Sequence, residues 1–319
     1  MNKLVSVVIP NYNCAEYLDK CLEHIVNQTY SNIECIVCDN GSTDNSLEII
    51  NSWAAKDSRI KVLTTEVNQG GLRCYNRMFF EAKGDYVMIQ DSDDWCDLRR
   101  VEKQAAILDK YDVGCCMTNS VFYYSHIEPE YPVQPGSGMV DITKEDWAPA
   151  TIMFKREILK IIPGYNLYWD RVTSYDNYFI MDVISKFGGY YLDEYLYFVL
   201  ARPNSDHRTI ELNDPHAMRK LVSYNIYKEL KRQRIETGTD WLNDNNMTAL
   251  KAYEEKLINN KRFIADKLRM FASIQIDNGK FKTGWELLRQ ALSLAPGYGK
   301  NYKTLMYLLR SMVKNKSDK

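Results

Sequence analysis

Short apolar segments alternate with helix-like segments over the first 117 residues, and this alternation restricts the possible folds more than any other feature. The predicted strands are Leu4–Ile9, Ile33–Cys38, Ile60–Thr64, Asp85–Gln90 and Val113–Met117. Between them, apolar residues recur every three or four positions, as Leu18, Leu22 and Ile25 do, which is typical of amphipathic helices. Four such β–α repeats predict an α/β fold with a parallel sheet and right-handed crossovers.

Polar clusters follow three of these strands. They are Pro10–Asn13, Asp39–Asp44 and Asp91–Asp94. The carboxyl ends of parallel strands meet at one edge of a sheet, and ligands bind at that edge in folds of this class. Neither G-x-G-x-x-G nor G-x-x-x-x-G-K-[ST] follows the first strand. The sequence therefore predicts a nucleotide-type site that lacks the dinucleotide fingerprint and the P-loop.

The composition is that of a globular protein. Of the 319 residues, 45% are hydrophobic and 26% are charged, which is enough apolar material for a large domain with an appendage. The formal net charge of −1 argues against binding to nucleic acid through bulk electrostatics. Residues 1–5 show no secretory signal and no run of about 18 apolar residues occurs, so we expect a cytoplasmic protein with reduced thiols.

All eight cysteines lie between Cys14 and Cys116. Cys35 and Cys38 form a C-x-x-C, but they lie in an apolar predicted strand. No second ligand pair stands at the spacing of a zinc site. Core packing is the predicted role of this pair, and a metal or redox site is the alternative.

The pattern changes after residue 117. A stretch rich in Tyr, Pro and Gly leads to a predicted strand at Thr151–Phe154, a helix at Tyr178–Phe187 and a strand at Tyr190–Val199. The chain then becomes helical to its end. One tetratricopeptide-like unit occurs near Gly279, but a repeat array needs at least three units, so we predict a helical appendage. The predicted domains are 1–208, divided into a nucleotide-binding half (1–117) and an acceptor half (118–208), and a helical region at 209–319.

The acidic cluster after the fourth strand suits a divalent cation. Asp91 and Asp93 are two residues apart in an extended segment, so their carboxylates lie on one side of the chain, about 7 Å apart. One can bind Mg²⁺ or Mn²⁺ directly while the other holds a bound water or a ribose hydroxyl, and phosphate oxygens complete the shell. The alternative is a helix N-cap with acidic first-turn residues, which applies to Asp94 or Asp97.

Several motifs, in order and spacing, resemble those of family 2 glycosyltransferases of the GT-A fold. They are V-S-V-V-I-P-N-Y-N, C-L-E-H-I-V-N-Q-T-Y, C-D-N-G-S-T-D-N-S, the stretch from Asn76 to Asp94, Tyr175-Asp176, and E-Y-L-Y…R-P-N-S at 194–205. The resemblance covers about residues 4–205 and implies a Rossmann-like nucleotide-sugar domain with a mixed central sheet. It also implies transfer of a sugar from a nucleotide sugar to an acceptor hydroxyl, with inversion at the anomeric carbon.

The resemblance assigns roles to residues that match the family's motifs. The positions that match its nucleoside and diphosphate sites are Pro10, Tyr12, Asp39 and Asp91. Asp91 and Asp93 match the metal-binding motif, which implies Mn²⁺ or Mg²⁺ as cofactor. Asp176 matches the general base, since inversion needs a carboxylate opposite the leaving diphosphate. A helix N-cap before Tyr178 is a compatible alternative for Asp176.

Three positions depart from the family pattern. Asn40 replaces the second acid after the second strand, which alters base or ribose contacts. Tyr175 replaces the Glu of the Glu-Asp pair. Arg202 replaces a His that can reach the metal or the diphosphate, and its fork binds phosphate rather than metal. Arg73 is a further candidate for the diphosphate, with a solvated helix charge as its alternative.

Aromatic and acidic residues of the second half are candidates for the sugar or acceptor pocket. We assign Trp147, Trp95 and Asp170 to it, because aromatic rings stack on sugar rings. Core packing is the alternative for each tryptophan.

The last 69 residues carry a net charge of about +9 by count, and their final helix is amphipathic. Its apolar residues are Leu305, Leu308, Leu309 and Met312, beside the cations Lys303 and Arg310. This pattern is typical of a peripheral contact with the inner face of the plasma membrane. Packing of this helix on its neighbour, with solvated lysines, is the favoured interpretation, and the earlier helices could form a homodimer interface.

The function predicted from the sequence is that of an inverting glycosyltransferase in surface-polysaccharide or glycoconjugate biosynthesis. Its partners would be a nucleotide-sugar donor, with UDP implied by the resemblance alone, and a glycan or lipid-linked glycan acceptor. A non-catalytic glycan- or nucleotide-binding scaffold for another glycosyltransferase is the alternative. A sugar-nucleotide pyrophosphorylase is disfavoured, because residues 11–19 lack a Gly-rich basic loop.

Overall fold

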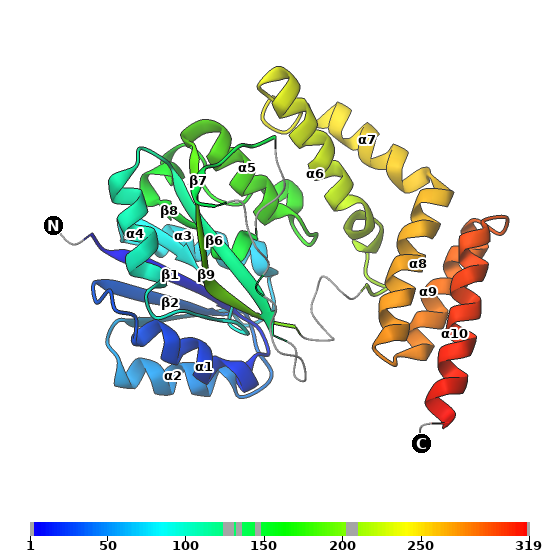
Figure 1. Ribbon diagram of the computed structural model, residues 1–319, viewed down its shortest axis with the longest axis horizontal. Helices are drawn as coiled ribbons and strands as arrows, with labels where there is room; N and C mark the ends of the chain where they lie inside the picture. Colours follow the sequence, from blue (N-terminus) through cyan, green and yellow to red (C-terminus); the bar gives the residue numbers. More distant parts are fainter. Residues whose placement is uncertain (1–2, 124–130, 132–135, 144–147, 202–209, 318–319) are drawn as a thin grey trace. The chain divides into compact units, whose positions relative to one another are not determined.

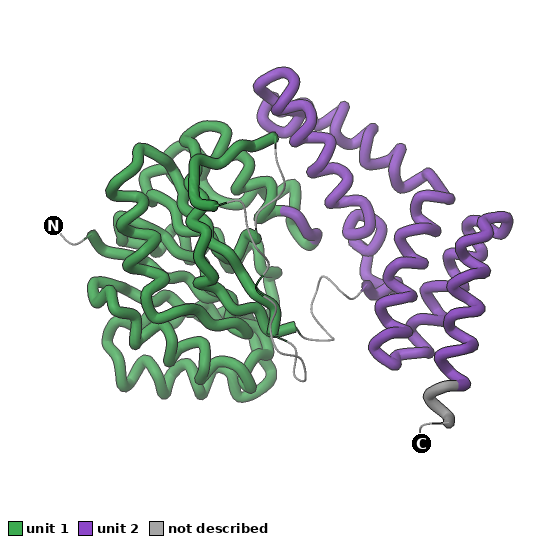
Figure 2. The backbone as a smooth tube through the Cα atoms, in the orientation of Figure 1, with its two compact units in different colours: residues 1–171, 175–201 green, residues 172–174, 202–319 purple. Residues whose placement is uncertain are grey.

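The computed structural model describes residues 3–123, 131, 136–143, 148–201 and 210–317. The chain forms two compact units, which Figure 2 colours separately. Unit 1 contains residues 1–171 and 175–201, and unit 2 contains residues 172–174 and 202–319. The predicted domain boundary, between residues 208 and 209, falls outside the described residues and stays a prediction.

Unit 1 is built on a mixed sheet, in which nine strands lie within the described residues (Figure 1). In spatial order they are β3 (Ile60–Thr64), β2 (Ile33–Asp39), β1 (Val5–Asn11), β4 (Tyr86–Ile89), β8 (Met153–Lys155), β6 (Cys115–Tyr123), β9 (Gly189–Leu200) and β5 (Trp95–Cys96), with β7 (Gly138–Met139) paired to β9. Strands β1 to β4 are parallel where they pair, and β8 is antiparallel to both β4 and β6. The predicted α/β class with a mixed sheet is confirmed.

The helices of unit 1 bury one face each, except the last, in which every residue from Tyr178 to Ile184 is buried. They are α1 (Ala15–Val26), α2 (Ser46–Lys56), α3 (Gly71–Glu81), α4 (Arg100–Lys110) and α5 (Tyr175–Phe187). Leu18, Leu22 and Ile25 of α1 are fully buried, as their spacing predicts. All eight cysteines are free and buried, and Cys35 and Cys38 lie in the fully buried strand β2. Core packing is therefore the role of the C-x-x-C.

The register of the parallel strands aligns their carboxyl ends. Asn11 of β1 lies opposite Asp39 of β2, and Val8 of β1 lies opposite Ile89 of β4. The chain leaves β4 two residues before Asp91. The three polar clusters thus start from adjacent strands at one edge of the sheet, as predicted.

Unit 2 is helical in the part that the structure describes. Its helices are α6 (Ala217–Thr237), α7 (Met247–Asn259), α8 (Lys261–Asp277), α9 (Phe281–Leu294) and α10 (Gly299–Ser317). Helices α8 and α9 pack against each other through apolar side chains. The fully buried residues there include Leu268 and Ala272 of α8 and Leu288 and Ala291 of α9. Across the described residues, every helix is too short or too polar to span a bilayer.

Gly84→Ala tests the close contact between β1 and the turn before β4. A Cβ atom at Gly84 would lie 2.6 Å from the backbone nitrogen of Ser6 and 2.7 Å from the carbonyl oxygen of Leu4. Since backbone must move, we expect the free energy of unfolding, measured with urea, to fall by about 1–3 kcal/mol. Gly138→Ala is the control, because no atom lies within 4 Å of its added Cβ. Equal losses for both variants would contradict the prediction.

Candidate active site

Asp39 is held rigidly at the carboxyl end of β2. Asn11 Nδ2 donates to Asp39 Oδ1 at 2.8 Å, and Ser42 Oγ donates to the same oxygen at 2.6 Å. The backbone nitrogen of Ser42 donates to Oδ2 at 3.2 Å. Asp39 is buried, and these bonds fix its carboxylate in one orientation.

Around Asp39, the predicted nucleoside residues differ in exposure. The Tyr12 side chain is 44% exposed, and Pro10 is half-buried. Asn40 is buried, and its Oδ1 accepts hydrogen bonds from Thr65 Oγ1 at 3.2 Å and from the backbone of Gln69 at 3.0 Å. The amide that replaces the family's second acid therefore anchors the loop after β3.

Two tyrosines from distant segments hold Asp91. Tyr75 Oη of α3 donates to Asp91 Oδ1 at 2.7 Å. Tyr197 Oη of β9 lies 3.4 Å from Oδ2 and accepts from the Asp91 backbone nitrogen at 3.2 Å. Burial raises the pKa of both phenols, and the Asp91 charge raises them further. Both phenols are thus protonated donors at neutral pH.

Asp93 and Asp94 extend this cluster. Asp93 is half-buried, whereas Asp94 is buried and its Oδ1 accepts from the backbone of Leu200 at 2.8 Å. Burial, with the charges of Asp91 and Asp93, raises the pKa of Asp94 to about 8.

The N-cap interpretation of these acids is wrong. Helix α4 begins at Arg100 with Arg99 as its N-cap, and that cap has no side-chain hydrogen bond. Asp94 accepts a hydrogen bond from Leu200 at the end of β9. Asp97 Oδ1 accepts from the backbone nitrogen of Arg99 at 2.9 Å, and Arg99 is the residue before the helix. The acids thus precede the helix without capping it.

A fully buried arginine lies beneath the acidic cluster. Arg100 donates from Nε to Gln104 Oε1 at 3.0 Å, from Nη1 to Gln90 Oε1 at 3.1 Å and from Nη2 to the Ala150 carbonyl at 2.9 Å. Its guanidinium carbon is 4.8 Å from the centre of the Tyr197 ring. Burial lowers the pKa of Arg100, and the negative charge of Asp91 opposes that effect. Sequence reasoning missed this residue, although a lone cation on the apolar face of α4 was a usable signal.

Asp176 lies in the first turn of α5, which begins at Tyr175. It is therefore not the N-cap of a helix that starts at Tyr178. Its Oδ1 accepts from the backbone of Asn177 at 2.8 Å, and the residue is half-buried.

A tyrosine cluster connects Asp176 with Asp91. The Tyr165 ring centre is 5.2 Å from that of Tyr75 and 4.8 Å from that of Tyr175. Burial raises the pKa of Tyr165, and the charges of Tyr175, Asp176 and Asp91 add to this effect. Tyr165 thus packs between Tyr75, which donates to Asp91, and Tyr175, which precedes Asp176.

Asn76 fixes Tyr165 in this position. Its Oδ1 accepts from the Tyr165 backbone nitrogen at 2.7 Å, and its Nδ2 donates to the Tyr165 carbonyl at 2.8 Å. Gly164 has a φ of +123° and approaches so closely that a Cβ would lie 2.5 Å from Asn76 Oδ1. Only glycine fits there, since both the backbone angle and the space exclude a side chain.

The structure brings Arg73 and Asp170 together. Arg73 Nε and Nη2 donate to Asp170 Oδ2 at 2.9 and 2.7 Å. The other oxygen, Oδ1, is buried and has no partner among the described residues. The sequence assigned Arg73 to the diphosphate and Asp170 to the sugar or acceptor, and here they form one pair.

The predicted tryptophans and Arg202 are placed only in part. Trp95 is half-buried, with its ring centre 4.9 Å from that of Tyr123 and 3.1 Å from Lys20 Nζ. Trp147 and Arg202 lie outside the described residues. Among the residues that are described, no group of three His, Cys, Asp or Glu side chains is arranged to hold a metal ion.

Fold and site define an α/β protein with polar and acidic residues gathered at the carboxyl edge of its sheet, where ligands bind in folds of this class. Residues 6–165 match the family model described as Glycosyl transferase family 2, and the chain belongs to this family. It is 40% identical to glycosyltransferase GlyG of Streptococcus pneumoniae over 130 residues, 41% of this chain and 42% of that protein. It is 34% identical to the UDP-Glc:alpha-D-GlcNAc-diphosphoundecaprenol beta-1,3-glucosyltransferase WfaP of Escherichia coli over 131 residues, 41% of this chain and 49% of that protein. The chain thus matches about half or less of these curated relatives.

The fold is similar to that of S. aureus TarS 1-349 in complex with UDP-GlcNAc. The TM-score is 0.60 and the sequence identity 17%, over 98% of this chain and 92% of that chain. At this identity the likeness shows the fold alone. The predicted GT-A fold with C-terminal helices is confirmed.

Arg100→Met tests the support beneath the acidic cluster. The change leaves the buried acceptors of Gln90, Gln104 and Ala150 without their donor. We therefore expect the free energy of unfolding, measured with urea, to fall by about 2–4 kcal/mol. Arg99→Met is the control, because the Arg99 side chain is 56% exposed and solvent screens its pairing with Asp97. If Arg100→Met costs no more than its control, the buried guanidinium does not stabilise this region.

Proposed function

We propose that this chain transfers a sugar from a nucleotide-sugar donor to a hydroxyl of a glycan or lipid-linked glycan, with inversion, in bacterial surface-polysaccharide assembly. The observation that carries the proposal is a pair of contacts: Tyr75 donates to Asp91, and its ring centre lies 6.5 Å from that of Tyr175, the residue before Asp176. This cluster starts from the same carboxyl edge of the sheet as Asp39. UDP is the proposed nucleotide. The name of WfaP gives UDP-Glc as its donor, and TarS, which has a similar fold, has a structure in complex with UDP-GlcNAc.

The donor would lie along the carboxyl edge of the sheet. Asp39, with Tyr12, Pro10 and the loop that Asn40 anchors, would bind the nucleoside. Asp91 and Asp93 offer hard carboxylate oxygens, which fit Mn²⁺ or Mg²⁺ when diphosphate oxygens supply further ligands. When bound, such a cation neutralises charge that grows on the leaving diphosphate. Arg202, and Arg73 once released from Asp170, would add phosphate contacts.

Asp176 would act as the general base. Its carboxylate accepts the proton of the acceptor hydroxyl while the acceptor oxygen bonds to the anomeric carbon. The bond from that carbon to the diphosphate oxygen breaks on the opposite face, so the nucleoside diphosphate leaves and the configuration inverts. Trp95 and Trp147 would stack on sugar rings, and the unpartnered Asp170 Oδ1 is an acceptor for a sugar hydroxyl.

Asp176→Asn separates chemistry from donor binding. The amide keeps the size of the side chain but cannot take the proton, so we expect sugar transfer to fall at least about 100-fold. The donor dissociation constant, measured by calorimetry, should change less than about threefold. Asp112→Asn is the matched control, since Asp112 is fully exposed. Transfer at the wild-type rate would remove Asp176 as the base.

Asp93→Ala tests the donor site itself. We expect the shift in melting temperature that UDP-sugars produce with Mn²⁺ to disappear, because the variant loses one cation ligand. The measurement is a thermal-shift panel of UDP-, GDP- and dTDP-sugars, with and without Mn²⁺ or Mg²⁺. If no donor is turned over and Asp93→Ala leaves binding unchanged, the enzyme proposal fails. Donor or glycan binding without turnover would instead favour the non-catalytic scaffold.

A further inference from the structure

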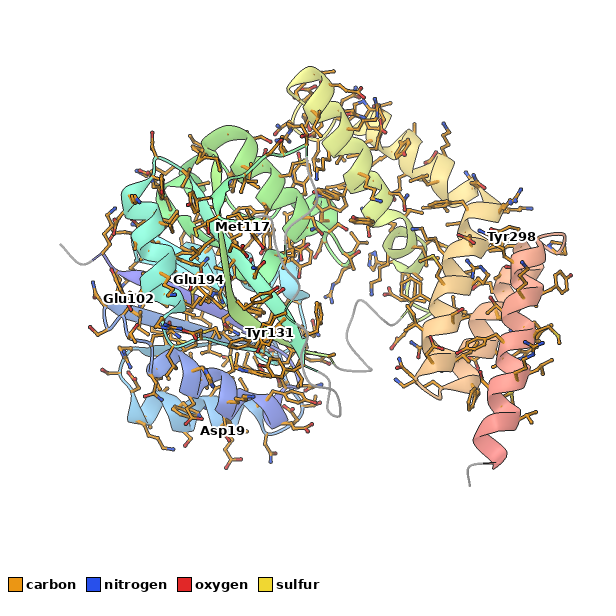
Figure 3. All side chains as sticks on the ribbon, viewed as in Figure 1. Asp19, Glu102, Met117, Tyr131, Glu194 and Tyr298 are labelled. Carbon is orange, nitrogen blue, oxygen red and sulfur yellow. The ribbon has the colours of Figure 1, made fainter. Side chains whose placement is uncertain are left out.

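A basic cavity opens at the N-terminal end of α10. Its volume is about 570 Å³, and three of its lining side chains are the cations Arg262, Lys300 and Lys303. None of the lining residues is acidic. Tyr298, labelled in Figure 3, lies directly before the helix and forms part of the wall.

Two of the three cavity cations lie close to an aromatic ring. The Arg262 guanidinium carbon is 4.7 Å and Lys300 Nζ is 5.9 Å from the centre of the Tyr298 ring. Tyr298 Oη donates to Asp266 Oδ1 at 3.0 Å, and that same oxygen also accepts from Arg269. Asp266 is therefore already paired, and the three cavity cations form no ion pair with the described residues.

An exposed apolar stripe continues from the cavity along α10. Its members are Tyr302, Met306, Leu309 and Val313, which are 48%, 51%, 49% and 70% exposed. Their spacings of four, three and four residues place them on one side of the helix. Lys303 and Arg310 lie beside the stripe and are exposed as well.

This stripe differs from the apolar face that the sequence indicated. Leu308 is buried, as are Asn301 and Thr304, so the side that carries Leu308 packs inside unit 2. The packing interpretation is correct for Leu308, while Leu309 belongs to the exposed stripe. The exposed half of α10 therefore has an apolar side and an adjacent basic side.

We infer that this surface of unit 2 binds an anionic lipid bilayer. Lipid phosphates would occupy the cavity of Arg262, Lys300 and Lys303, and the stripe would enter the boundary between headgroups and acyl chains. A partner for this surface must be anionic and apolar at once, and a bilayer with anionic headgroups has both properties. The inference deepens the proposed function, since it supplies the surface on which a lipid-linked acceptor would lie.

Charge argues against a second copy of the chain as the occupant. Residues 287–317 contain no acid, so a symmetric dimer through α10 would set Lys303 and Arg310 of one copy against the same cations of the other. Like charges at such an interface repel, whereas anionic headgroups attract every one of them.

Vesicle flotation with the full chain tests this inference. We expect binding to vesicles of 30% phosphatidylglycerol in phosphatidylcholine, at least about tenfold weaker binding to pure phosphatidylcholine, and a loss in 0.5 M salt. The double variants Lys300→Gln/Lys303→Gln and Met306→Ser/Leu309→Ser should each weaken binding about tenfold or more. The matched control is Met270→Ser/Lys282→Gln, which removes an exposed methionine and an exposed lysine elsewhere in unit 2.

The outcomes separate this inference from the proposed function. Equal binding to both kinds of vesicle, or wild-type binding by both α10 variants, would overturn it. A dimer in sedimentation that only the α10 variants lose would assign the surface to a second copy and overturn it too. Release of nucleotide from a UDP-sugar without vesicles depends on unit 1, so its failure alongside intact vesicle binding counts against the transferase proposal only.

Discussion

The register of three parallel strands determines where the candidate site of this protein lies. Because Asn11 pairs with Asp39 and Val8 with Ile89, β1, β2 and β4 end at the same edge of the sheet. Parallel strands require crossover helices, and each helix leaves from this edge. A shift of β2 by one residue would turn Asp39 to the opposite face of the sheet and break its bonds to Asn11 and Ser42. The site thus depends on the apolar packing that fixes this register.

The acidic edge is stabilised by neutral donors and one buried cation. Tyr75 and Tyr197 contact Asp91 through phenols that carry no charge. Arg100 supplies positive charge from below, but its hydrogen bonds go to two glutamines and a carbonyl. A direct ion pair with Asp91 would satisfy both groups and leave little attraction for an external cation. The observed arrangement holds the Asp91 carboxylate in place, while the Arg100 guanidinium is hydrogen-bonded to other acceptors.

Local patterns predicted the strands, the helices and the edge where the polar clusters meet, because hydrophobic periodicity depends on neighbours in sequence. They did not predict the partners of those clusters. Tyr197 contacts Asp91 across 106 positions, Arg73 contacts Asp170 across 97, and Asn76 clamps Tyr165 across 89. Such pairs depend on how loops return over the sheet, which no local spacing encodes. The same reason applies to α10, where spacing gave an amphipathic helix but burial decided which side is free.

The small net charge of the chain is the sum of two segments that carry charge of opposite sign. Residues 251–319 carry about +9 by count, which leaves about −10 for residues 1–250. An acid-rich site attracts a diphosphate only when a cation mediates, whereas a basic surface attracts anions without one. Salt also affects the two differently: Lys303 and Arg310 are exposed and screened over about 8 Å at physiological ionic strength, while Asp39 is buried and screened much less. The acidic and the basic surfaces of this chain therefore respond to salt to different degrees.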